Sequence, residues 1–383
     1  MRSLYLDHNA TTPLLPEAWE AMRPVAEAAV GNPSSAHHAG RKARQFLEDA
    51  RDRVAAALGA HPDEVFFTSG ATEANNLALF GLTAGASPPA HVLAAPFEHP
   101  CVIEPLKQLA ARHFDVDWLP VTPRGQVETA AVMARVRDDT RLVCLMLVNH
   151  ETGALQPVRH VAKKLPKQIP LHCDAAQAIG KIPVHFRDLS VTTLTASAHK
   201  FRGPTGVGLL LAKRGATIRP LMFGGHQQKG TRPGTEPVAL AVGLAVALEH
   251  AVRNLDVTRA HLEALGRRFL AGLGAALGQA FGVNGPEFGS PDALPTTLNV
   301  SFPGCRSDVL LVSLDLAGVA CSTGSACSSG SLLPSPVLQA MGVPDGVLRS
   351  AIRFSLGPTL TDGDIDEAVT RIAKCVREVR QRG

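Results

Sequence analysis

Short apolar runs alternate with longer amphipathic stretches through about the first 250 residues of the chain. The short runs end at polar or glycine-containing segments, which is typical of strands buried in a sheet. We expect strands at Val65–Thr68, His91–Ala94, Val116–Leu119, Leu142–Val148, Leu171–Cys173, Thr192–Ala196 and Val207–Leu211. Helical patterns between them cover Thr72–Leu82, Cys101–His113 and Val158–Leu165. This alternation predicts an α/β fold, with a mostly parallel seven-stranded sheet and helices on both of its faces.

The pattern changes after two long helical stretches, at Pro237–Arg253 and Thr258–Leu277. Strands and helices are then mixed, with strands expected at Thr297–Phe302, Val319–Ser322 and Ser350–Leu356 and helices at Ser307–Leu316 and Asp364–Arg380. We therefore predict a large domain over residues 15–255 and a smaller α+β domain formed by residues 1–14 and 256–383.

Composition and charge narrow the class of protein. Hydrophobic residues make up 45% of the chain and charged residues 19%, which supports a packed core and excludes general disorder. No apolar run is long enough to cross a membrane, and the N-terminus lacks an apolar signal core, so we expect a cytoplasmic protein. The net charge of +4 is spread along the chain, which gives no indication of nucleic-acid binding. The seven cysteines include no C-x-x-C pair, so neither a disulfide framework nor a structural zinc site is expected.

Polar and ionisable side chains follow five of the predicted strands. They lie in the segments Ser69–Glu73, Glu98–His99, Asn149–Gly153, Asp174–Gln177 and Ser197–Lys200. In an open parallel sheet, ligands bind outside the carboxyl ends of the strands. Five such segments therefore predict a ligand site at this edge of the sheet.

Two of these residues have the chemistry of a pyridoxal phosphate site. Asp174 directly follows an apolar strand and could either cap a helix or hold a proton on a pyridine nitrogen. Lys200 ends a strand before a glycine-rich turn, where it could be a surface lysine or an amine placed for Schiff-base chemistry. A carboxylate and a lysine at the ends of successive strands are what pyridoxal phosphate requires.

A phosphate could be held close by. Gly70 allows close approach of the backbone, and the free amides of Ala71 and Thr72 suit an anion at a helix N-terminus, although an ordinary helix cap would explain the same residues. Ser197 and His199, beside the lysine, would add phosphate donors.

Motifs spread over the whole chain resemble those of a known family. They lie at Tyr5–Thr12, Gly31–His37, Thr68–Asn75, Glu98–His99, Val148–Gly153, Asp174–Gln177, Ser197–Lys200, Arg232–Thr235, Ser322–Ser328 and Ile352–Leu356. In these motifs the chain is similar to the pyridoxal-phosphate-dependent cysteine desulfurases of the NifS and IscS type, which belong to the class V aminotransferases of fold type I. The resemblance implies conversion of L-cysteine to L-alanine, with the sulfur held as a protein persulfide and passed to an acceptor such as an iron–sulfur scaffold protein.

The resemblance also implies roles for individual residues around the cofactor ring. Lys200 forms the Schiff base with the cofactor and later moves the α-proton of the substrate. His99 stacks on the ring and acts as an acid or base. Asp174 pairs with the ring nitrogen, and Gln177 contacts the phenolic oxygen.

Further roles concern the cofactor phosphate and the substrate. The phosphate is held by Ala71, Thr72, Ser197 and His199, joined by Thr235 from the second subunit of a homodimer. Asn149, which also borders the cofactor, and Arg353 hold the substrate carboxylate, a task that suits the planar fork of a guanidinium group.

The sulfur acceptor is expected to be Cys327, which stands in the Gly-Ser-Ala-Cys-Ser motif. The segment from Cys321 to Ser331 has almost no bulky side chains, so we expect it to move. Five other cysteines are interpreted as small core residues, namely Cys101, Cys144, Cys173, Cys321 and Cys375. Cys305 is expected to be exposed in a loop and to have no function.

Some features leave alternatives open. The segment Gly224–Gly230 departs from the family pattern at His226, Gln228 and Lys229, near the expected dimer interface. A class V aminotransferase or a selenocysteine lyase acting on a small amino acid is the alternative enzyme. A sulfur-carrier protein that has lost turnover is the alternative outside catalysis, although Lys200, Asp174 and His99 argue against it.

Overall fold

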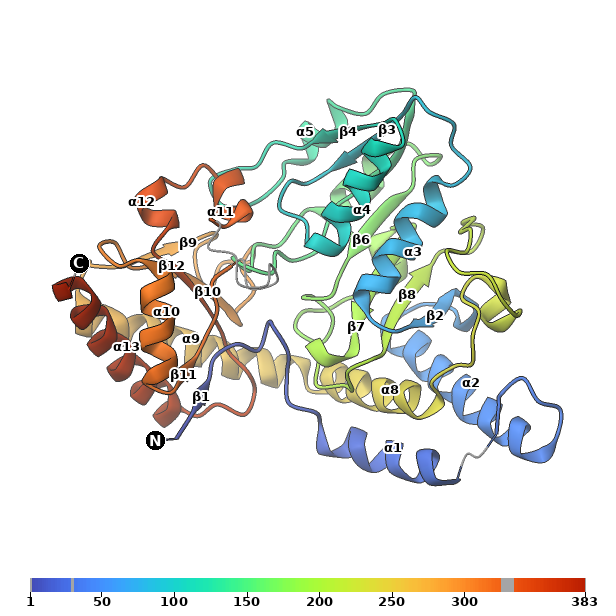
Figure 1. Cartoon of the computed structure of the whole chain (residues 1–383), viewed down its shortest axis with the longest axis horizontal. Helices are drawn as coiled ribbons and strands as arrows, with labels where there is room; N and C mark the ends of the chain where they lie inside the picture. The colour runs from blue at the N-terminus through green and yellow to red at the C-terminus, as the bar shows by residue number, and fades with distance from the viewer. Residues whose placement is uncertain (1, 29–30, 325–333, 383) are drawn as a thin grey trace.

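The computed structural model describes residues 2–28, 31–324 and 334–382, and its largest element is a seven-stranded sheet (Figure 1). The strand order is β2–β8–β7–β6–β5–β3–β4, and β8 is antiparallel to both of its neighbours while the other pairs are parallel. The strands are β2 (Val65–Thr68), β3 (Ala90–Ala94), β4 (Phe114–Trp118), β5 (Thr140–Cys144), β6 (Leu171–Asp174), β7 (Thr193–Ser197) and β8 (Gly208–Ala212). The predicted α/β fold with a mostly parallel seven-stranded sheet is confirmed.

Neighbouring residues on each strand pack into different cores, because successive side chains of a strand point to opposite faces. Phe66 of β2 packs in the core beneath α3 (Ala71–Thr83) and α4 (Pro100–Ala111), whereas Phe67 packs in the core on the other face. The helices that contribute to this second core are α1 (Pro16–Ala28), α2 (His38–Leu58), α5 (Thr129–Met133), α6 (Val158–Lys164), α7 (Phe186–Leu189) and α8 (Val238–Arg253), joined by the short helices α11 (Pro336–Ala340) and α12 (Asp345–Leu348). The sheet is thus covered by helices on both faces, as predicted.

A separate apolar core lies among the C-terminal elements and the start of the chain. Its sheets are β12–β10–β9 and the parallel pair β1–β11, with helices packed beside them. The elements of this part are β1 (Leu4–Tyr5), α9 (Leu255–Leu277), β9 (Gly282–Asn284), β10 (Thr297–Ser301), α10 (Ser307–Leu316), β11 (Val319–Ala320), β12 (Ala351–Ser355) and α13 (Asp362–Arg382). Three fully buried phenylalanines pack together in this core, where the Phe354 ring is tilted against Phe269 and meets Phe302 edge-to-face.

The N-terminal segment connects this core to the large sheet. Its backbone pairs with β11 and β12, where the Leu6 N–H donates to Ala320 O at 2.8 Å and the His8 N–H donates to Ser355 O at 3.2 Å. Four residues further on, the Thr12 N–H donates to His199 O at 3.0 Å, next to the end of β7. Residues 9–11 therefore run past the carboxyl ends of the sheet strands.

The segment that departs from the family pattern covers an edge of the sheet. The Gln228 amide donates to Phe67 O at 2.8 Å and accepts from the Phe67 N–H at 2.7 Å. Gln228 and Lys229 both have positive φ, of 48° and 61°. A side-chain amide paired in this way occupies the free hydrogen-bonding groups of edge strand β2.

One cysteine prediction is wrong. Cys305 lies in a loop, but it is only 6% exposed, because the loop folds onto α13 and places its Sγ 3.7 Å from Val376 O. Cys144, Cys173 and Cys375 are buried as expected.

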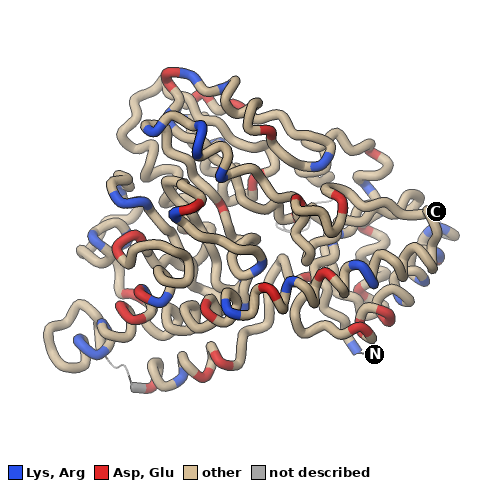
Figure 2. Tube along the Cα trace, turned by 180° about the vertical axis from the view of Figure 1, so that it is seen from behind, with Lys and Arg blue, Asp and Glu red and all other residues tan. Residues whose placement is uncertain are grey.

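Two whole-chain properties complete the fold. Within the described ranges, no single helix is long and apolar enough to span a membrane; α8 and α9 pass such a test only as a pair, and they are bent by 70° to each other. Figure 2 shows that basic and acidic residues are interspersed along the chain.

Candidate active site

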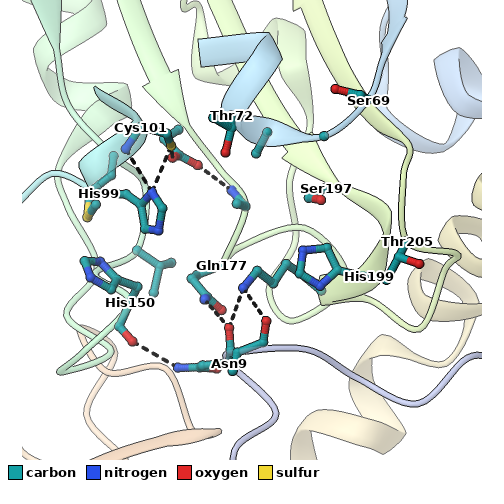
Figure 3. A pocket seen from close by; sticks show the side chains of 18 of the residues that line it. Asn9, Ser69, Thr72, His99, Cys101, His150, Gln177, Ser197, His199 and Thr205 are labelled. Carbon is teal, nitrogen blue, oxygen red and sulfur yellow. Dashed lines mark hydrogen bonds between the residues drawn. The ribbon is translucent and has the colours of Figure 1, made fainter. Parts of the chain in front are cut away.

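A cavity of about 420 Å³ lies at the carboxyl ends of the sheet strands. All five predicted strand-end segments contribute to its wall, through Ser69, His99, His150, Asp174 and Lys200. Figure 3 shows His99 and His150 on one side of the cavity and Ser197 and His199 on the other. The prediction that these segments meet at one edge of the sheet is confirmed.

Lys200 reaches this cavity from a single helical turn (Ala198–Lys200) that directly follows β7. Its ammonium group donates to the backbone carbonyls of Asn9 and Ala10, at 2.6 and 2.9 Å. Both carbonyls belong to the N-terminal segment, which the sequence did not place near the lysine. The amine is thus held by neutral acceptors at the cavity wall.

Asp174 is oriented by a buried network of hydrogen bonds. Its Oδ2 accepts from the Asn75 amide at 2.9 Å, and Asn75 Oδ1 in turn accepts from the Thr195 hydroxyl at 2.5 Å. His172 Nε2 lies 3.0 Å from the same Oδ1 and must donate to it, so its Nδ1 accepts from the Thr193 hydroxyl at 2.9 Å. Burial lowers the pKa of His172 to about 4, which keeps the ring neutral and this direction of donation fixed.

His99 begins α4 as its N-cap, and this fixes the position of its ring proton. Its Nδ1 accepts from the Cys101 backbone N–H at 3.2 Å, so in the neutral ring the proton is on Nε2. Burial is the main cause that lowers the pKa of His99. The ring lies edge-to-face with His150, with 5.3 Å between the ring centroids.

Cys101, interpreted from the sequence as a core residue, is buried but also lines the cavity. Its Sγ lies 2.9 Å from His99 Nδ1 and 3.0 Å from the Asn75 amide nitrogen. Burial raises its pKa well above the ordinary value, so it is a thiol. It therefore links the His99 ring to the network that holds Asp174.

An anion cradle forms where α3 begins. Gly70 is the N-cap and makes no side-chain cap bond, so the first amides of the helix, at Ala71 and Thr72, remain at the cavity wall. The Gly70 backbone packs closely against Gly208 of β8, because a Cβ on Gly208 would lie only 2.6 Å from the Gly70 Cα. Ser197 and His199 also line the cavity here, and burial lowers the pKa of His199 to about 4.

Arg353 of β12 closes the opposite part of the cavity. Its Nη1 donates to His150 O at 3.1 Å and its Nη2 to Asp7 Oδ1 at 2.9 Å. The residue is 3% exposed, and among the described residues its Nε has no hydrogen-bond partner. A buried guanidinium donor of this kind is suited to a carboxylate ligand.

Gln177 lines the cavity with an amide whose orientation is fixed from behind. Its Oε1 accepts from the Lys181 ammonium group at 2.5 Å, and its Nε2 donates to Asn9 O at 3.0 Å. Lys181 also donates to Asn9 Oδ1 at 3.0 Å. The N–H₂ side of Gln177 therefore points toward the lysine site.

Three predicted site residues are not brought to the cavity by the described structure. The Asn149 side chain is buried in its own turn, where Oδ1 accepts from the Glu151 and Thr152 N–H groups at 2.9 and 3.0 Å. Thr235 is exposed and lies outside the cavity wall of its own chain. Cys327 lies outside the described residues. The predicted roles of these three residues stay predictions.

Sequence reasoning missed Asn9, Asn75, His150 and Lys181. Asn9 and Asn75 lie inside motifs quoted above. Neither directly follows a predicted strand of the sheet, so neither was predicted to belong to the site. His150 stands next to Asn149 in a strand-end segment, but only Asn149 was predicted to bind a ligand. Lys181 lies four residues after Gln177 and does not line the cavity itself, but it holds Gln177 and Asn9, which do.

The donor set around the cavity matches pyridoxal phosphate in kind: a lysine amine, a carboxylate and an anion cradle at a helix N-terminus. A cavity of about 420 Å³ is in the usual size range for a cofactor with its substrate. Among the described residues, no group of three or more His, Cys, Asp and Glu side chains is placed to hold a metal ion.

Comparison with known proteins places the whole chain in one family. The family model for class-V aminotransferases matches residues 4–368. The "Cysteine desulfurase IscS" of Dictyoglomus turgidum is 39% identical over 381 residues, covering 99% of this chain and 96% of the relative. The "IscS-like cysteine desulfurase" of Mycobacterium tuberculosis is 39% identical over 385 residues, covering 98% and 97%.

Solved structures agree with this result. A NifS-like protein superposes with a TM-score of 0.91 at 36% identity, covering 98% of this chain and 100% of that protein. The resemblance inferred from the motifs is therefore confirmed over the full length. The chain belongs to the class-V aminotransferase family, within its cysteine desulfurases of the IscS and NifS type.

Proposed function

We propose that this chain is a pyridoxal-phosphate-dependent cysteine desulfurase that converts L-cysteine to L-alanine and holds the sulfur as a persulfide on Cys327. The observation that carries the proposal is that Lys200, Asp174 and Arg353 line one cavity. The strand of Arg353 also pairs with Ser322, through backbone bonds of 2.6 and 3.1 Å, five residues before the proposed acceptor. Membership of the cysteine desulfurase family supports the interpretation of this cavity as the site that binds the cofactor and L-cysteine.

The residues around the cavity fit the cofactor as follows. Lys200 would hold it covalently, Asp174 would face the ring nitrogen, and Gln177 would donate to the phenolic oxygen. The amides of Ala71 and Thr72 would bind the phosphate together with Ser197 and His199. When bound, pyridoxal phosphate supplies an electron sink for charge that develops on the substrate carbons.

The chain's own residues then orient the substrate and move protons. Arg353 binds the carboxylate of L-cysteine, and its contacts with His150 O and Asp7 keep the guanidinium in place. Lys200 removes the α-proton once its amine is released. His99, which carries its neutral-state proton on Nε2, can give that proton at the cavity side of the ring.

The sulfur step is balanced without an external oxidant. The Cys327 thiolate attacks the sulfur of the substrate, so an S–S bond forms while the substrate Cβ–S bond breaks. The electron pair of the broken bond stays with the substrate carbon, which takes up a proton to give L-alanine. Cysteine and the protein thiol thus become alanine and a protein persulfide, which a sulfur-accepting protein can take over.

The active enzyme in this proposal is a cytoplasmic homodimer. Leu221, Met222 and Phe223 are 40%, 46% and 89% exposed, and contiguous exposed apolar side chains are a feature of interfaces. They precede Thr235, which would reach the phosphate of the neighbouring subunit. Mixing inactive Lys200→Ala chains with inactive Thr235→Ala chains should restore part of the activity, whereas a fully active monomer would contradict the dimer.

The test of the function is incubation with L-cysteine and a thiol reductant, with sulfide and alanine quantified together. A desulfurase releases the two in equal amounts. A parallel reaction with a labelled amino donor and a keto acid tests the alternative, since a class V aminotransferase would move the label and release no sulfide. Selenocysteine as substrate would extend the specificity without changing this stoichiometry.

A further inference from the structure

The carboxyl group of Glu151 lies between the two described chain ends that flank residues 325–333. On one side, the Ser335 hydroxyl donates to Glu151 Oε2 at 2.5 Å. On the other side, Gly324 packs so closely that a Cβ on it would lie 1.8 Å from the same oxygen. Glu151 is 1% exposed, so a single buried carboxyl group contacts the chain before and after the stretch that contains Cys327.

These contacts leave the carboxyl group little freedom. Ser335 is the N-cap of α11, where its Oγ also accepts from the Leu338 N–H at 3.1 Å, so the hydroxyl is fixed by the helix. A side chain at Gly324 would overlap a carboxyl group that cannot swing away without losing Ser335. Glycine is therefore required at this position for space.

The backbone of Glu151 lies in the turn that places His150 at the wall of the cavity. Its backbone N–H donates to Asn149 Oδ1 at 2.9 Å, within the turn that also presents His150. His150 lines the cavity, and its carbonyl accepts from Arg353 Nη1 at 3.1 Å and from the Asn9 amide at 3.3 Å. The turn thus joins the proposed substrate-carboxylate site to both flanks of the Cys327 segment.

Burying the carboxyl group of Glu151 costs free energy, and the need to fill space at this position does not account for an ionisable group there. Burial raises the pKa of Glu151 to about 7, which shows that the site disfavours the charged form. An apolar side chain would fill the same space without this cost. A carboxyl group at this place supplies something that an apolar group cannot, an acceptor for the Ser335 hydroxyl.

We propose that Glu151 is a positioning residue for Cys327, because its carboxyl group accepts a hydrogen bond from Ser335 on one flank of the Cys327 segment and packs against Gly324 on the other. The inference rests on the proposed function, in which Cys327 takes the sulfur. Removing the carboxyl group should leave L-cysteine binding intact and slow the attack of Cys327 on it. A displacement of about 1 Å at a reacting group costs on the order of 100-fold in rate.

The test compares single-turnover persulfide formation in three variants of the full-length holoenzyme. Glu151→Ala removes both contacts, Ser335→Ala removes one, and Glu151→Gln keeps an oxygen acceptor of the same reach. The matched control is Glu64→Ala, since Glu64 is another buried carboxylate and accepts the His61 and Arg214 N–H groups at 2.8 and 3.0 Å. Persulfide on Cys327 is quantified by mass spectrometry, and L-cysteine binding by the absorbance change of the cofactor.

Glu151→Ala should lower the persulfide rate on the order of 100-fold and Ser335→Ala on the order of tenfold, with KM within about twofold of wild type. Glu151→Gln should retain most of the rate, and Glu64→Ala should lose stability only. The inference is overturned if Glu151→Ala acts through KM or slows the reaction no more than Glu64→Ala. If Glu151→Ala does not fold, the persulfide rates of Ser335→Ala and Glu151→Gln are compared with the rate of Glu64→Ala and test the inference instead. A wild-type enzyme that forms no persulfide on Cys327 would instead remove the proposed function.

A double-mutant cycle adds a second, independent test. In the wild-type background, Gly324→Ala should strongly lower the rate of persulfide formation, because the added Cβ overlaps the Glu151 carboxyl group. In the Glu151→Ala background, the same substitution should lower this rate by less than about twofold, since the overlapping carboxyl atoms are absent. Equal costs in both backgrounds would show that the two residues act separately and would contradict the inference.

Discussion

Replacing Gly208 by alanine should weaken cofactor binding through a backbone clash at a distance from Lys200. Gly208 lies in β8 between Thr68 of β2 and Ser197 of β7. A Cβ at this position would lie 2.6 Å from both Cα and C of Gly70 and 2.7 Å from Ala196 O. All three are backbone atoms, so no side-chain rotation can relieve the overlap.

The size of the effect follows from these distances. Gly70 has to move by about 1 Å to reach the ~3.5 Å of an ordinary carbon–carbon contact. Gly70 directly precedes the amides of Ala71 and Thr72, so the anion cradle moves with it. Losing one hydrogen bond to a charged group costs about 1.5–3 kcal/mol, which corresponds to roughly a 10- to 100-fold rise in the dissociation constant. Overpacking should also lower the stability of the apoprotein by about 1–3 kcal/mol.

The assay is titration of the apoprotein with pyridoxal phosphate, followed by the absorbance of the bound cofactor. The matched control is Gly274→Ala in α9, where an added Cβ meets no atom within 4 Å. The control should bind with the wild-type dissociation constant. A Gly208→Ala protein with unchanged affinity and unchanged thermal stability would refute the idea that Gly70 rests on Gly208.

Three further predictions concern single residues of the site. Borohydride reduction of the holoenzyme followed by peptide mapping should place the pyridoxyl label on Lys200; a label on Lys181 would reassign the attachment. Arg353→Lys should raise KM for L-cysteine by about tenfold or more, because an ammonium group lacks the planar fork, and an unchanged KM would exclude Arg353 from the carboxylate site. Because burial raises the pKa of Glu151 from 4.5 to about 7, its contribution to stability is present below pH 4.5 and is lost as the pH rises through about 7. Relative to Glu151→Gln, the wild-type free energy of unfolding in urea should therefore fall by about 3 kcal/mol between pH 4.5 and 8, whereas a pH-independent difference would contradict the burial argument.

The strands of the large sheet could be predicted from the sequence because most of them are buried on both faces. Leu209, Leu210 and Leu211 of β8 show why: alternate residues enter different cores, so the strand is an unbroken apolar run. Other elements were not predicted. Helix α2 has an apolar side that includes Leu47, Val54 and Leu58, but it precedes the first strand of the sheet and so lies outside the alternation of strands and helices on which the prediction rested. Strand β9 has only three residues, is largely exposed and forms by pairing with β10, so its own sequence carries little apolar signal.

The site could be predicted where its residues directly follow strands, as for Asp174 and Lys200, because sheet topology alone brings strand ends together. Contacts between distant segments could not be predicted in this way. Asn9 meets Lys200 across 191 positions, and Asn75 meets Asp174 across 99, through packing that no local pattern encodes. The Asn149 side chain is oriented by hydrogen bonds within its own turn, where its Oδ1 accepts from the Glu151 and Thr152 N–H groups, and no local pattern indicates these bonds.

In the proposed function, the sulfur of L-cysteine passes to Cys327. Brief exposure of the holoenzyme to L-cysteine without reductant, followed by peptide mass spectrometry of all seven cysteines, tests this transfer. We expect one added sulfur atom on Cys327, with Cys101 in the cavity wall and Cys321 directly after β11 unmodified. Added sulfur on Cys101 or Cys321, with Cys327 bare, would contradict it.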